Sequence, residues 1–447
     1  MPLTQELGRF VAGLSFEKLP EAAVAVVRTG FIDTIATMIA GAHDPAPQLL
    51  RRGLAPASGP ASLYFSGETA PAPEAAWING TAGHALDYDD VGCRGHLSTV
   101  LVPAILTEAE TLGRGGRDMV AAYVAGYETW AELARRDPGH HHVKGWHPTG
   151  IFGTIGAAAA CAALRRLSSE QTTMALALSA SQAGGIMANF GTMTKPFHAG
   201  RAAHAGLVSA RLAELGFTAA ADALEHPQGF LSAVSPEGRA ELGGAAPLGE
   251  EWQIVRQGLS IKKYPACYCT HRALDAMLDL LAKRPLKAQE IARITVEISK
   301  THAVILRNHR PQTGLEAKFS MEFAMAAAVV SRRASLGEYT DAFVRRPEVQ
   351  QLMGRVAIAT NENYDPDAIG GSVWDQVTIE LANGETIESE KVHRARGHAE
   401  RPLGEAELFD KFRTCLDAGH ARIAPEALFD RLRRLETISA RELTAVG

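Results

Sequence analysis

The chain has 447 residues, of which 46% are hydrophobic and 21% charged, and 45 basic against 50 acidic side chains give it a net charge of −5. These values are typical of a globular protein long enough for two or three domains. They exclude a basic nucleic-acid-binding protein and a polybasic membrane-surface protein, so we expect neither nucleic acid nor a membrane as a partner. The N-terminus lacks the pattern of a secretory signal, and the five scattered cysteines are typical of reduced thiols, which predicts a cytoplasmic protein.

The first half of the chain predicts one helix after another. The most apolar long stretch, residues 22–42, contains Arg28 and Asp33, so we interpret it as a buried core helix rather than a membrane span. Residues 74–86 form another Ala-rich helical segment. Only a short stretch, residues 61–65, has the character of a strand in this half.

Strand patterns appear in the later part of the chain. Residues 293–299 alternate with a period of two, which predicts a strand. Residues 377–381 and 386–390 flank Asn383-Gly384, a strong hairpin signal. This part of the chain is therefore predicted to be an α+β unit. Two helices follow from Leu403 onward, and they either cap the α+β unit or pack back on the helical half.

A cluster of titratable residues lies where the helix of residues 74–86 ends. It contains two imidazoles and three carboxylates: His84, His96, Asp87, Asp89 and Asp90. On a helix His84 and Asp87 share a face, because they are three residues apart. The cluster is either a solvated, acidic helix end or a functional site. Acidic groups at a helix C-terminus oppose the helix dipole, so the first interpretation carries a cost.

A second histidine-rich segment contains His140, His141, His142 and His147. Metal sites need ligands fixed by geometry, and a run of loop histidines is more often solvated. The pair Cys267 and Cys269 lacks the second pair of a zinc motif. We therefore predict no metal site, while a functional role for His147 alone remains open.

Lysines mark two further candidate positions. Lys195 precedes a proline at the start of a helix, where a cation opposes the dipole and calls for an anion such as a bound carboxylate. The alternative is an exposed lysine. Lys262 and Lys263 stand at the start of the α+β unit, shortly before His271. Two domains meeting there would form a cleft, which is a usual ligand location.

Together these segments resemble the MmgE/PrpD family, which includes 2-methylcitrate dehydratase, cis-aconitate decarboxylase and iminodisuccinate epimerase. The matching segments occur in order along nearly the whole chain: His84-Ala-Leu-Asp-Tyr-Asp-Asp, His147-Pro-Thr, Thr194-Lys-Pro-Phe-His-Ala-Gly, Lys262-Lys-Tyr-Pro-Ala, Ala317-Lys-Phe-Ser and Gly397-His. The resemblance implies a mainly α fold, with a large all-helical domain from residues 1–260 and 397–447. It also implies an inserted α+β lid domain of residues 261–396, a site in the cleft between the domains, and a homodimer.

The resemblance also implies which side chains act. The catalytic residues it implies are Asp87, His96, His147, Lys195 and Lys262. Around them we expect substrate contacts from His84, Lys263, Cys267, His271 and Phe323. Three positions depart from the decarboxylase-like pattern, because Val91, Cys267 and Phe323 stand where it has Thr, His and Tyr. These departures argue against both aconitate decarboxylation and methylcitrate dehydration.

The predicted function is therefore an enzyme that needs no cofactor and removes a proton beside a carboxylate of a small di- or tricarboxylate. Lys195 and Lys262 would grip the substrate and stabilise the enediolate, His96 and His147 would be the acid–base pair, and Asp87 would orient or charge one imidazole. We predict an isomerase or lyase similar to iminodisuccinate epimerase. A 2-methylcitrate-type dehydratase, a cis-aconitate-type decarboxylase, a metal-dependent lyase and a catalytically decayed binding protein remain as alternatives.

Overall fold

Helices make up most of this protein, whose computed structural model describes residues 2–362 and 373–445. The chain divides into two units. Unit 1 comprises Met1–Leu259 and Gly404–Gly447, and unit 2 comprises Ser260–Leu403. The helices near the C-terminus thus belong to the helical unit, which decides between the two alternatives that the sequence left open.

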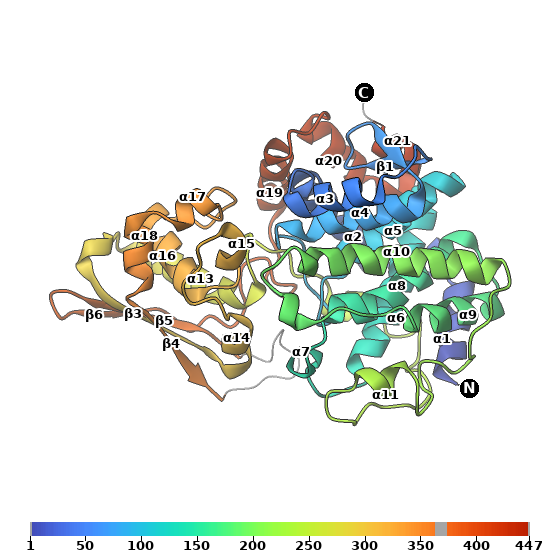
Figure 1. Cartoon of the computed structure of the whole chain (residues 1–447), viewed down its shortest axis with the longest axis horizontal. Coiled ribbons are helices and arrows are strands. Elements are labelled where there is room, and N and C mark those ends of the chain that lie inside the picture. Colours follow the sequence, from blue (N-terminus) through green and yellow to red (C-terminus); the bar gives the residue numbers. More distant parts are fainter. Residues whose placement is uncertain (1, 363–372, 446–447) are drawn as a thin grey trace. The chain divides into compact units, whose positions relative to one another are not determined.

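Unit 1 is almost entirely helical (Figure 1). Its elements are α1 (Leu3–Gly13), α2 (Glu21–Gly41), α3 (Pro45–Leu54), β1 (Ala61–Leu63), β2 (Glu68–Ala70), α4 (Ala72–Ala85), α5 (Ser98–Leu112), α6 (Gly116–Arg135), α7 (His141–Lys144), α8 (Pro148–Arg165), α9 (Ser169–Ala180), α10 (Thr194–Glu214), α11 (Phe230–Val234), α12 (Gln253–Gln257), α19 (Glu405–Ala418), α20 (Pro425–Arg433) and α21 (Ala440–Thr444). The short hairpin of β1 and β2 is its only sheet among the described residues.

Helix α2 is the apolar segment noted in the sequence. It is the one helix among the described residues that has the length and composition to cross a membrane, and 72% of its most apolar window is buried inside the protein. Asp33, in its middle, is fully buried and forms an ion pair with Lys411 of α19 at 2.5 Å. Burial and an internal counter-ion are the properties of a core helix, so the sequence interpretation is confirmed.

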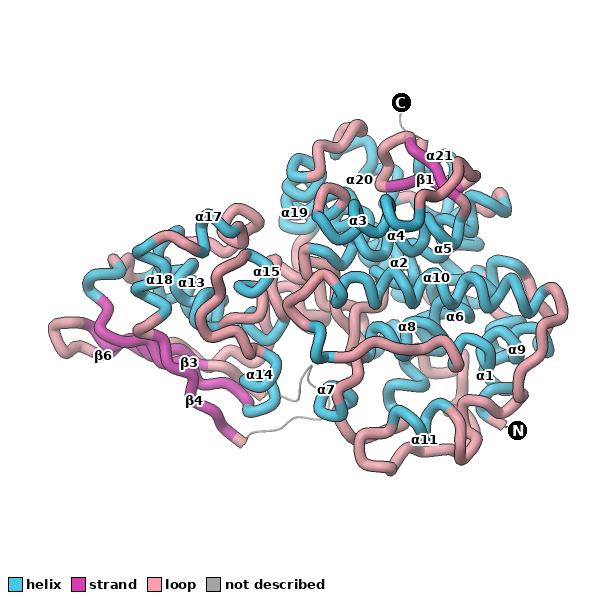
Figure 2. Tube along the Cα trace, in the orientation of Figure 1, coloured by secondary structure: helices cyan, strands magenta, loops and turns pink. Residues whose placement is uncertain are grey.

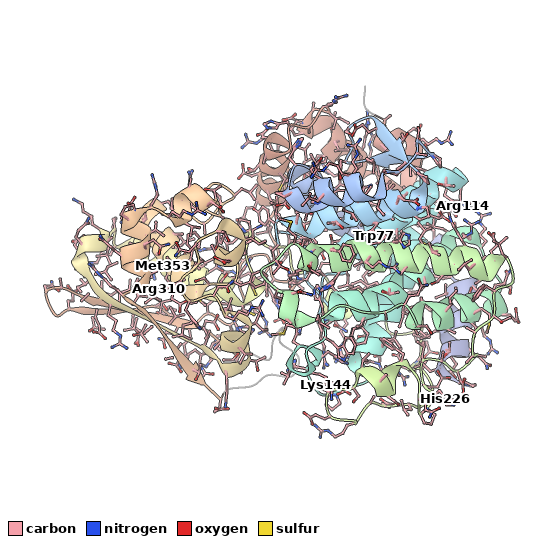
Figure 3. The ribbon with its side chains drawn as sticks, in the orientation of Figure 1. Trp77, Arg114, Lys144, His226, Arg310 and Met353 are labelled. Carbon is pink, nitrogen blue, oxygen red and sulfur yellow. The ribbon has the colours of Figure 1, made fainter. Side chains whose placement is uncertain are left out.

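Glycines let helices α4, α8 and α10 approach one another at backbone distance. A Cβ atom at Gly200 of α10 would lie 2.1 Å from the carbonyl oxygen of Trp77 in α4. A Cβ atom at Gly206 would lie 2.6 Å from the carbonyl oxygen of Thr154 in α8. Trp77, which is labelled in Figure 3, packs on Phe197 with ring centroids 5.3 Å apart. This close packing holds the three helices beside one another.

Unit 2 combines helices with a small sheet (Figure 2). Its elements are α13 (His271–Lys283), β3 (Ile291–Ser299), α14 (Lys300–Ile305), α15 (Gly314–Ala317), α16 (Met321–Ser331), α17 (Asp341–Val344), α18 (Pro347–Met353), β4 (Val356–Asn361), β5 (Gln376–Leu381) and β6 (Thr386–Glu388). The strand order is β4-β3-β5-β6, with β3 and β4 parallel and the other pairs antiparallel.

The sheet of unit 2 confirms the strand predictions. The predicted strand of residues 293–299 is the central strand β3, whose side chains Ile294, Val296 and Ile298 are fully buried. The predicted hairpin is formed by β5 and β6, and Gly384 in its turn has a φ of +87°, which favours glycine. The buried face of β3 explains the period of two in the sequence.

Candidate functional site

Three helix ends of unit 1 supply a cluster of buried polar side chains. His84 lies in the last turn of α4, His147 is the residue just before α8, and Lys195 is in the first turn of α10. All three side chains are almost fully buried. The close packing of these helices therefore brings residues more than a hundred positions apart to one place.

The turn after α4 carries the carboxylates. Asp87 has a φ of +50°, a left-handed conformation that a residue other than glycine adopts at some energetic cost and that aspartate tolerates better than most. The backbone N–H of Asp87 donates to the carbonyl oxygen of His84 at 3.1 Å. The chain thus reverses direction directly after the helix, which lets the following residues fold back towards His84.

Lys195 and Asp87 form a buried ion pair. The ammonium group donates to Oδ1 of Asp87 at 2.7 Å, and both side chains are nearly inaccessible to solvent. The same ammonium lies 5.3 Å from the centroid of the Phe190 ring, within the range of a cation–π contact. A cation is thereby held among uncharged rings, where its field is weakly screened.

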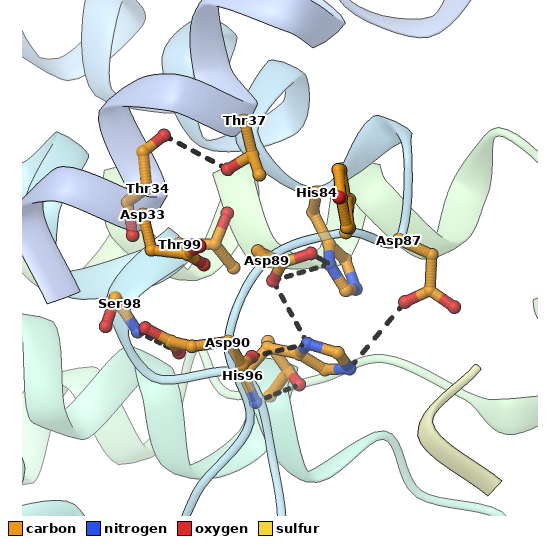
Figure 4. A network of polar contacts seen from close by, with 12 residues as sticks. Asp33, Thr34, Thr37, His84, Asp87, Asp89, Asp90, His96, Ser98 and Thr99 are labelled. Atoms are coloured by element: carbon orange, nitrogen blue, oxygen red, sulfur yellow. Dashed lines mark hydrogen bonds and ion pairs between the residues drawn. The ribbon is translucent and has the colours of Figure 1, made fainter. Parts of the chain in front are cut away.

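Asp89 links two imidazoles (Figure 4). Its two oxygens lie 2.9 Å and 3.0 Å from Nδ1 of His84, and one of them lies 3.0 Å from Nδ1 of His96. Burial acts to raise the pKa of Asp89, but the neighbouring His84 and His96 outweigh it and hold this pKa well below its usual range. Asp89 is therefore a carboxylate that accepts from both Nδ1 atoms, which leaves the lone pair of each neutral ring on Nε2.

His84 is the most enclosed of these imidazoles. Burial lowers its pKa to about 3, against the opposing effect of Asp89. Its ring centroid lies 4.4 Å from that of His96 and 5.9 Å from that of His147. Within residues 2–362 and 373–445, Nε2 of His84 has no hydrogen-bond partner. With Nδ1 donating to Asp89, this nitrogen is an acceptor whose lone pair has no donor among these residues.

His96 lies on the more open side of the cluster, with 12% of its side chain exposed. Its Nδ1 is 2.9 Å from the carbonyl oxygen of Asp90 as well as near Asp89, and its Nε2 is 3.9 Å from Oδ1 of Asp87. Its backbone N–H donates to Thr149 Oγ1 at 3.1 Å, which ties this loop to the start of α8. His96 therefore meets both the orienting carboxylate and the Lys195–Asp87 pair.

His147 forms a second imidazole pair with His198. Their Nδ1 atoms are 3.2 Å apart, so one ring donates its N–H to the other. Burial and the charge of Lys195 hold the pKa of His147 well below its ordinary value, and burial lowers the pKa of His198 to about 4. Both rings are neutral near pH 7. The site thus contains neutral imidazoles beside a buried ammonium group.

A second network lies behind the same turn. Lys411 donates to the carbonyl oxygen of Tyr88 at 2.7 Å and pairs with Asp33. Burial and the nearby charge of Asp33 raise the pKa of Asp90 well above its usual value, which favours its protonated form. The backbone N–H of Ser98 donates to Asp90 at 3.3 Å. These contacts fasten the turn to α2, α5 and α19.

The structure brings together four of the five residues predicted to be catalytic. Asp87, His96, His147 and Lys195 converge in unit 1, together with His84 from the predicted substrate contacts. Lys262 belongs to unit 2, where its side chain is fully buried. The roles of all five remain predictions.

The other predicted substrate contacts also belong to unit 2. His271 and Cys267 are buried near the start of α13, where the backbone N–H of Cys267 donates to the carbonyl oxygen of Lys318 at 2.9 Å. Phe323 is fully buried in α16 and packs edge-on against Tyr339 with centroids 5.1 Å apart. Lys263 is half-buried. Phe323 thus lies in an aromatic core cluster of its own unit.

Sequence reasoning named Asp89 and His198 but gave neither a role. Asp89 makes the contacts with Nδ1 of His84 and His96, whereas Asp87 lies 3.9 Å from Nε2 of His96, and its orienting role remains a prediction. The five-residue separation of His84 and Asp89 matches no helical spacing, so no periodicity could reveal it. For His198 the signal was its position three residues after Lys195, on the same face of a helix start.

One set of potential metal ligands is present among the described residues. One nitrogen or oxygen from each of His84, Asp87, Asp89 and His96 lies within 4.8 Å of the others. The loop histidines at residues 140–142 do not belong to this set.

Comparison with known proteins matches both parts of the chain. The model of the MmgE/PrpD N-terminal domain matches residues 5–242, and that of the MmgE/PrpD C-terminal domain matches residues 264–428. A cis-aconitate decarboxylase from Homo sapiens is 29% identical over 381 residues, covering 82% of this chain and 77% of its own. A cis-aconitate decarboxylase from Aspergillus terreus is 24% identical over 439 residues, covering 92% and 89% of the two chains.

Proposed function

Because the chain belongs to the MmgE/PrpD family, we propose that it is an acid–base enzyme that moves a proton at a carbon beside a carboxylate of a small di- or tricarboxylate. One observation carries this proposal: the buried ammonium of Lys195 lies in the same cluster as the neutral imidazoles of His84 and His147 and the imidazole of His96. A cation that binds carboxylate and bases that accept a proton are the two requirements of such chemistry.

The cation and the imidazoles have separate tasks in this proposal. The ammonium of Lys195, held by Asp87, binds a substrate carboxylate and stabilises the negative charge that develops on it as the proton leaves. Fixed charges in a poorly hydrated site do this without reorganisation. His96 and His147 exchange the proton, and neutral rings are able to accept one near pH 7. Lys262 is expected to add a second cation.

The relatives direct the first choice of reaction to a carbon–carbon lyase acting on a cis-aconitate-type tricarboxylate. In such a decarboxylation, the electron pair released with CO2 shifts the double bond, and the carbon at its far end takes up a proton. That carbon lies beside a carboxylate. The same acid–base cluster therefore serves decarboxylation and simple proton exchange.

Epimerisation without loss of CO2 is a second candidate. It is favoured by Val91, Cys267 and Phe323, which stand where the decarboxylase-like pattern has Thr, His and Tyr. Cys267 and Phe323 are both buried, and neither side chain supplies the imidazole or the phenol that the other pattern has at these positions. An iminodisuccinate-type substrate would need only proton removal and return.

The proposal is tested by incubating the protein in D2O with succinate-, citrate-, aspartate- and cis-aconitate-type acids and following each by NMR. We expect deuterium to enter at a carbon beside a carboxylate of at least one acid, with or without formation of CO2. Release of CO2 selects the lyase, and exchange alone selects the epimerase. No exchange with any acid by protein that has kept its fold would overturn the proposal.

A further inference from the structure

The strongest unexplained feature of the cluster is the nitrogen Nε2 of His84. The side chain of His84 has no exposed surface, and among the described residues this atom has no hydrogen-bond partner. A buried polar atom without a partner costs free energy, so it calls for an explanation, and a bound ion is one of them. In the close-up view it faces the space between Asp87 and His96 (Figure 4).

Asp89 gives this space the second shell of a metal site. Metal-binding imidazoles commonly donate their other N–H to a carboxylate, which fixes the ring and directs the lone pair at the metal. Asp89 accepts from Nδ1 of both His84 and His96. The Nε2 atoms of the two rings are therefore prepared as ligands by one shared carboxylate.

Asp87 completes the set. Its carboxylate lies 3.9 Å from Nε2 of His96. One nitrogen or oxygen from each of His84, Asp87, Asp89 and His96 lies within 4.8 Å of the others. Two imidazoles and one carboxylate with remaining open positions are a common set for divalent transition cations. The ammonium of Lys195, 2.7 Å from Asp87, competes for the same carboxylate.

We propose that His84, His96 and Asp87 form a binding site for a divalent transition cation such as Zn²⁺, in competition with the ammonium of Lys195. Entry of the cation takes Asp87 from Lys195 and occupies the lone pairs of two imidazoles. Binding therefore inhibits the enzyme rather than supporting it, and this consequence rests on the proposed function. The binding itself does not.

The test titrates Zn²⁺ into the full-length protein, freed of metal by EDTA and desalting, in competition with a chromophoric chelator. We expect His84→Ala to weaken Zn²⁺ binding at least about tenfold, because it removes one ligand. Lys195→Met should strengthen binding about three- to tenfold, because it removes the competing positive charge. His43→Ala, which removes a unit 1 imidazole outside the cluster, should leave the affinity unchanged.

The Zn²⁺ affinity is expected to fall in His84→Ala and to rise in Lys195→Met. Misfolding would lower it in both variants, so the two results together distinguish the loss of a ligand from a loss of folded structure. Equal affinity in the wild-type protein and His84→Ala, or no gain in Lys195→Met, would overturn the inference. Normal deuterium exchange alongside either result leaves the proposed function intact. If the protein shows the expected zinc affinities but exchanges no acid, the cation site stands and the proposed function falls. In an active protein, Zn²⁺ should abolish exchange and EDTA should restore it.

Discussion

Asp89 and Asp90 are neighbours in the chain, and neither has any exposed surface. Their pKa values nevertheless move in opposite directions. The imidazoles of His84 and His96 overcome burial and lower the pKa of Asp89, whereas burial and the charge of Asp33 raise that of Asp90. Burial is common to both, so the partners decide the charge.

The difference separates two functions of one turn. On the side that faces the imidazoles, Asp89 is an anion. Its removal would change which nitrogens of His84 and His96 carry protons. On the side that faces α2 and α19, Lys411 pairs with Asp33, and the charge of Asp33 helps to raise the pKa of Asp90, which favours its protonated form. In the segment of residues 87–90, Asp87 and Asp89 therefore face the candidate site, whereas Tyr88 and Asp90 attach the turn to neighbouring helices.

The largest effect is expected for Asp89→Asn. An amide cannot accept from both Nδ1 atoms, and its NH2 group forces one ring to carry its proton on Nε2. We expect turnover to fall by about 10³- to 10⁴-fold, as for the orienting carboxylate of a catalytic triad. The measurement is the rate of deuterium exchange on the best acid of the panel.

Asp90→Asn is the matched control for this change. It replaces an acid whose raised pKa favours the protonated form by a neutral group of similar shape, and it keeps an acceptor for the N–H of Ser98. Turnover should therefore remain close to that of the wild-type protein. Equal losses in the two variants would contradict the division of the turn.

Lys411→Met should act on stability instead. It leaves Asp33 buried without its cation, and breaking a buried ion pair in this way costs about 3–5 kcal/mol. Urea denaturation measures the loss. The double variant Asp33→Asn with Lys411→Met should recover part of it, because no charge is then stranded. A single variant as stable as the wild-type protein would show that this pair does not anchor the turn.

Lys195→Met removes the buried ammonium that pairs with Asp87 and should act on catalysis. Loss of one preorganised charge from the site lowers turnover by about 10²- to 10³-fold. Lys144→Met, a change at an exposed lysine of α7, is the control and should have no effect. Turnover of Lys195→Met within a few-fold of the wild-type value would show that Lys195 does not hold the substrate.

Glu128 can be compared with Asp89 and Asp90 because it is also a buried carboxyl group. Its oxygens accept from backbone N–H groups rather than from a cation or an imidazole. Burial raises its pKa to about 7, although the N–H groups of Ile254 and Gln253 act against this. The folded state thus holds the proton more tightly than the unfolded state, whose pKa is near 4.5. This stabilisation is present below pH 4.5 and is lost as the pH rises through 7.

The wild-type protein should therefore lose about 2 kcal/mol of stability between pH 5 and 7 that Glu128→Gln does not lose. Urea denaturation of both proteins at the two pH values measures this difference. Parallel changes in the two proteins would contradict the raised pKa.

The sequence predicted those parts of the molecule that depend on local patterns. Strand β3 has a period of two, and the turn at Asn383-Gly384 has its own residue preference, so both were found. Asp87, His147 and Lys195 were identified through resemblance, whereas Asp89, His198 and the pair of Asp33 with Lys411 were not assigned roles. The contacts of Asp89 and of Asp33 with Lys411 depend on a left-handed turn and on helices joined only in three dimensions, which no spacing in the chain encodes. For His198, the spacing from Lys195 places it on the same helix face but does not reveal its contact with His147.

The bond between Lys411 and Tyr88 joins residues 323 positions apart. Domains generally fold as units during synthesis, N-terminal first. Here the ribosome must complete all of unit 2 before it delivers the lysine that secures the acidic turn and neutralises Asp33. A chain that ends anywhere within residues 260–403 therefore lacks Lys411 and its contacts with Tyr88 and Asp33 behind the candidate site.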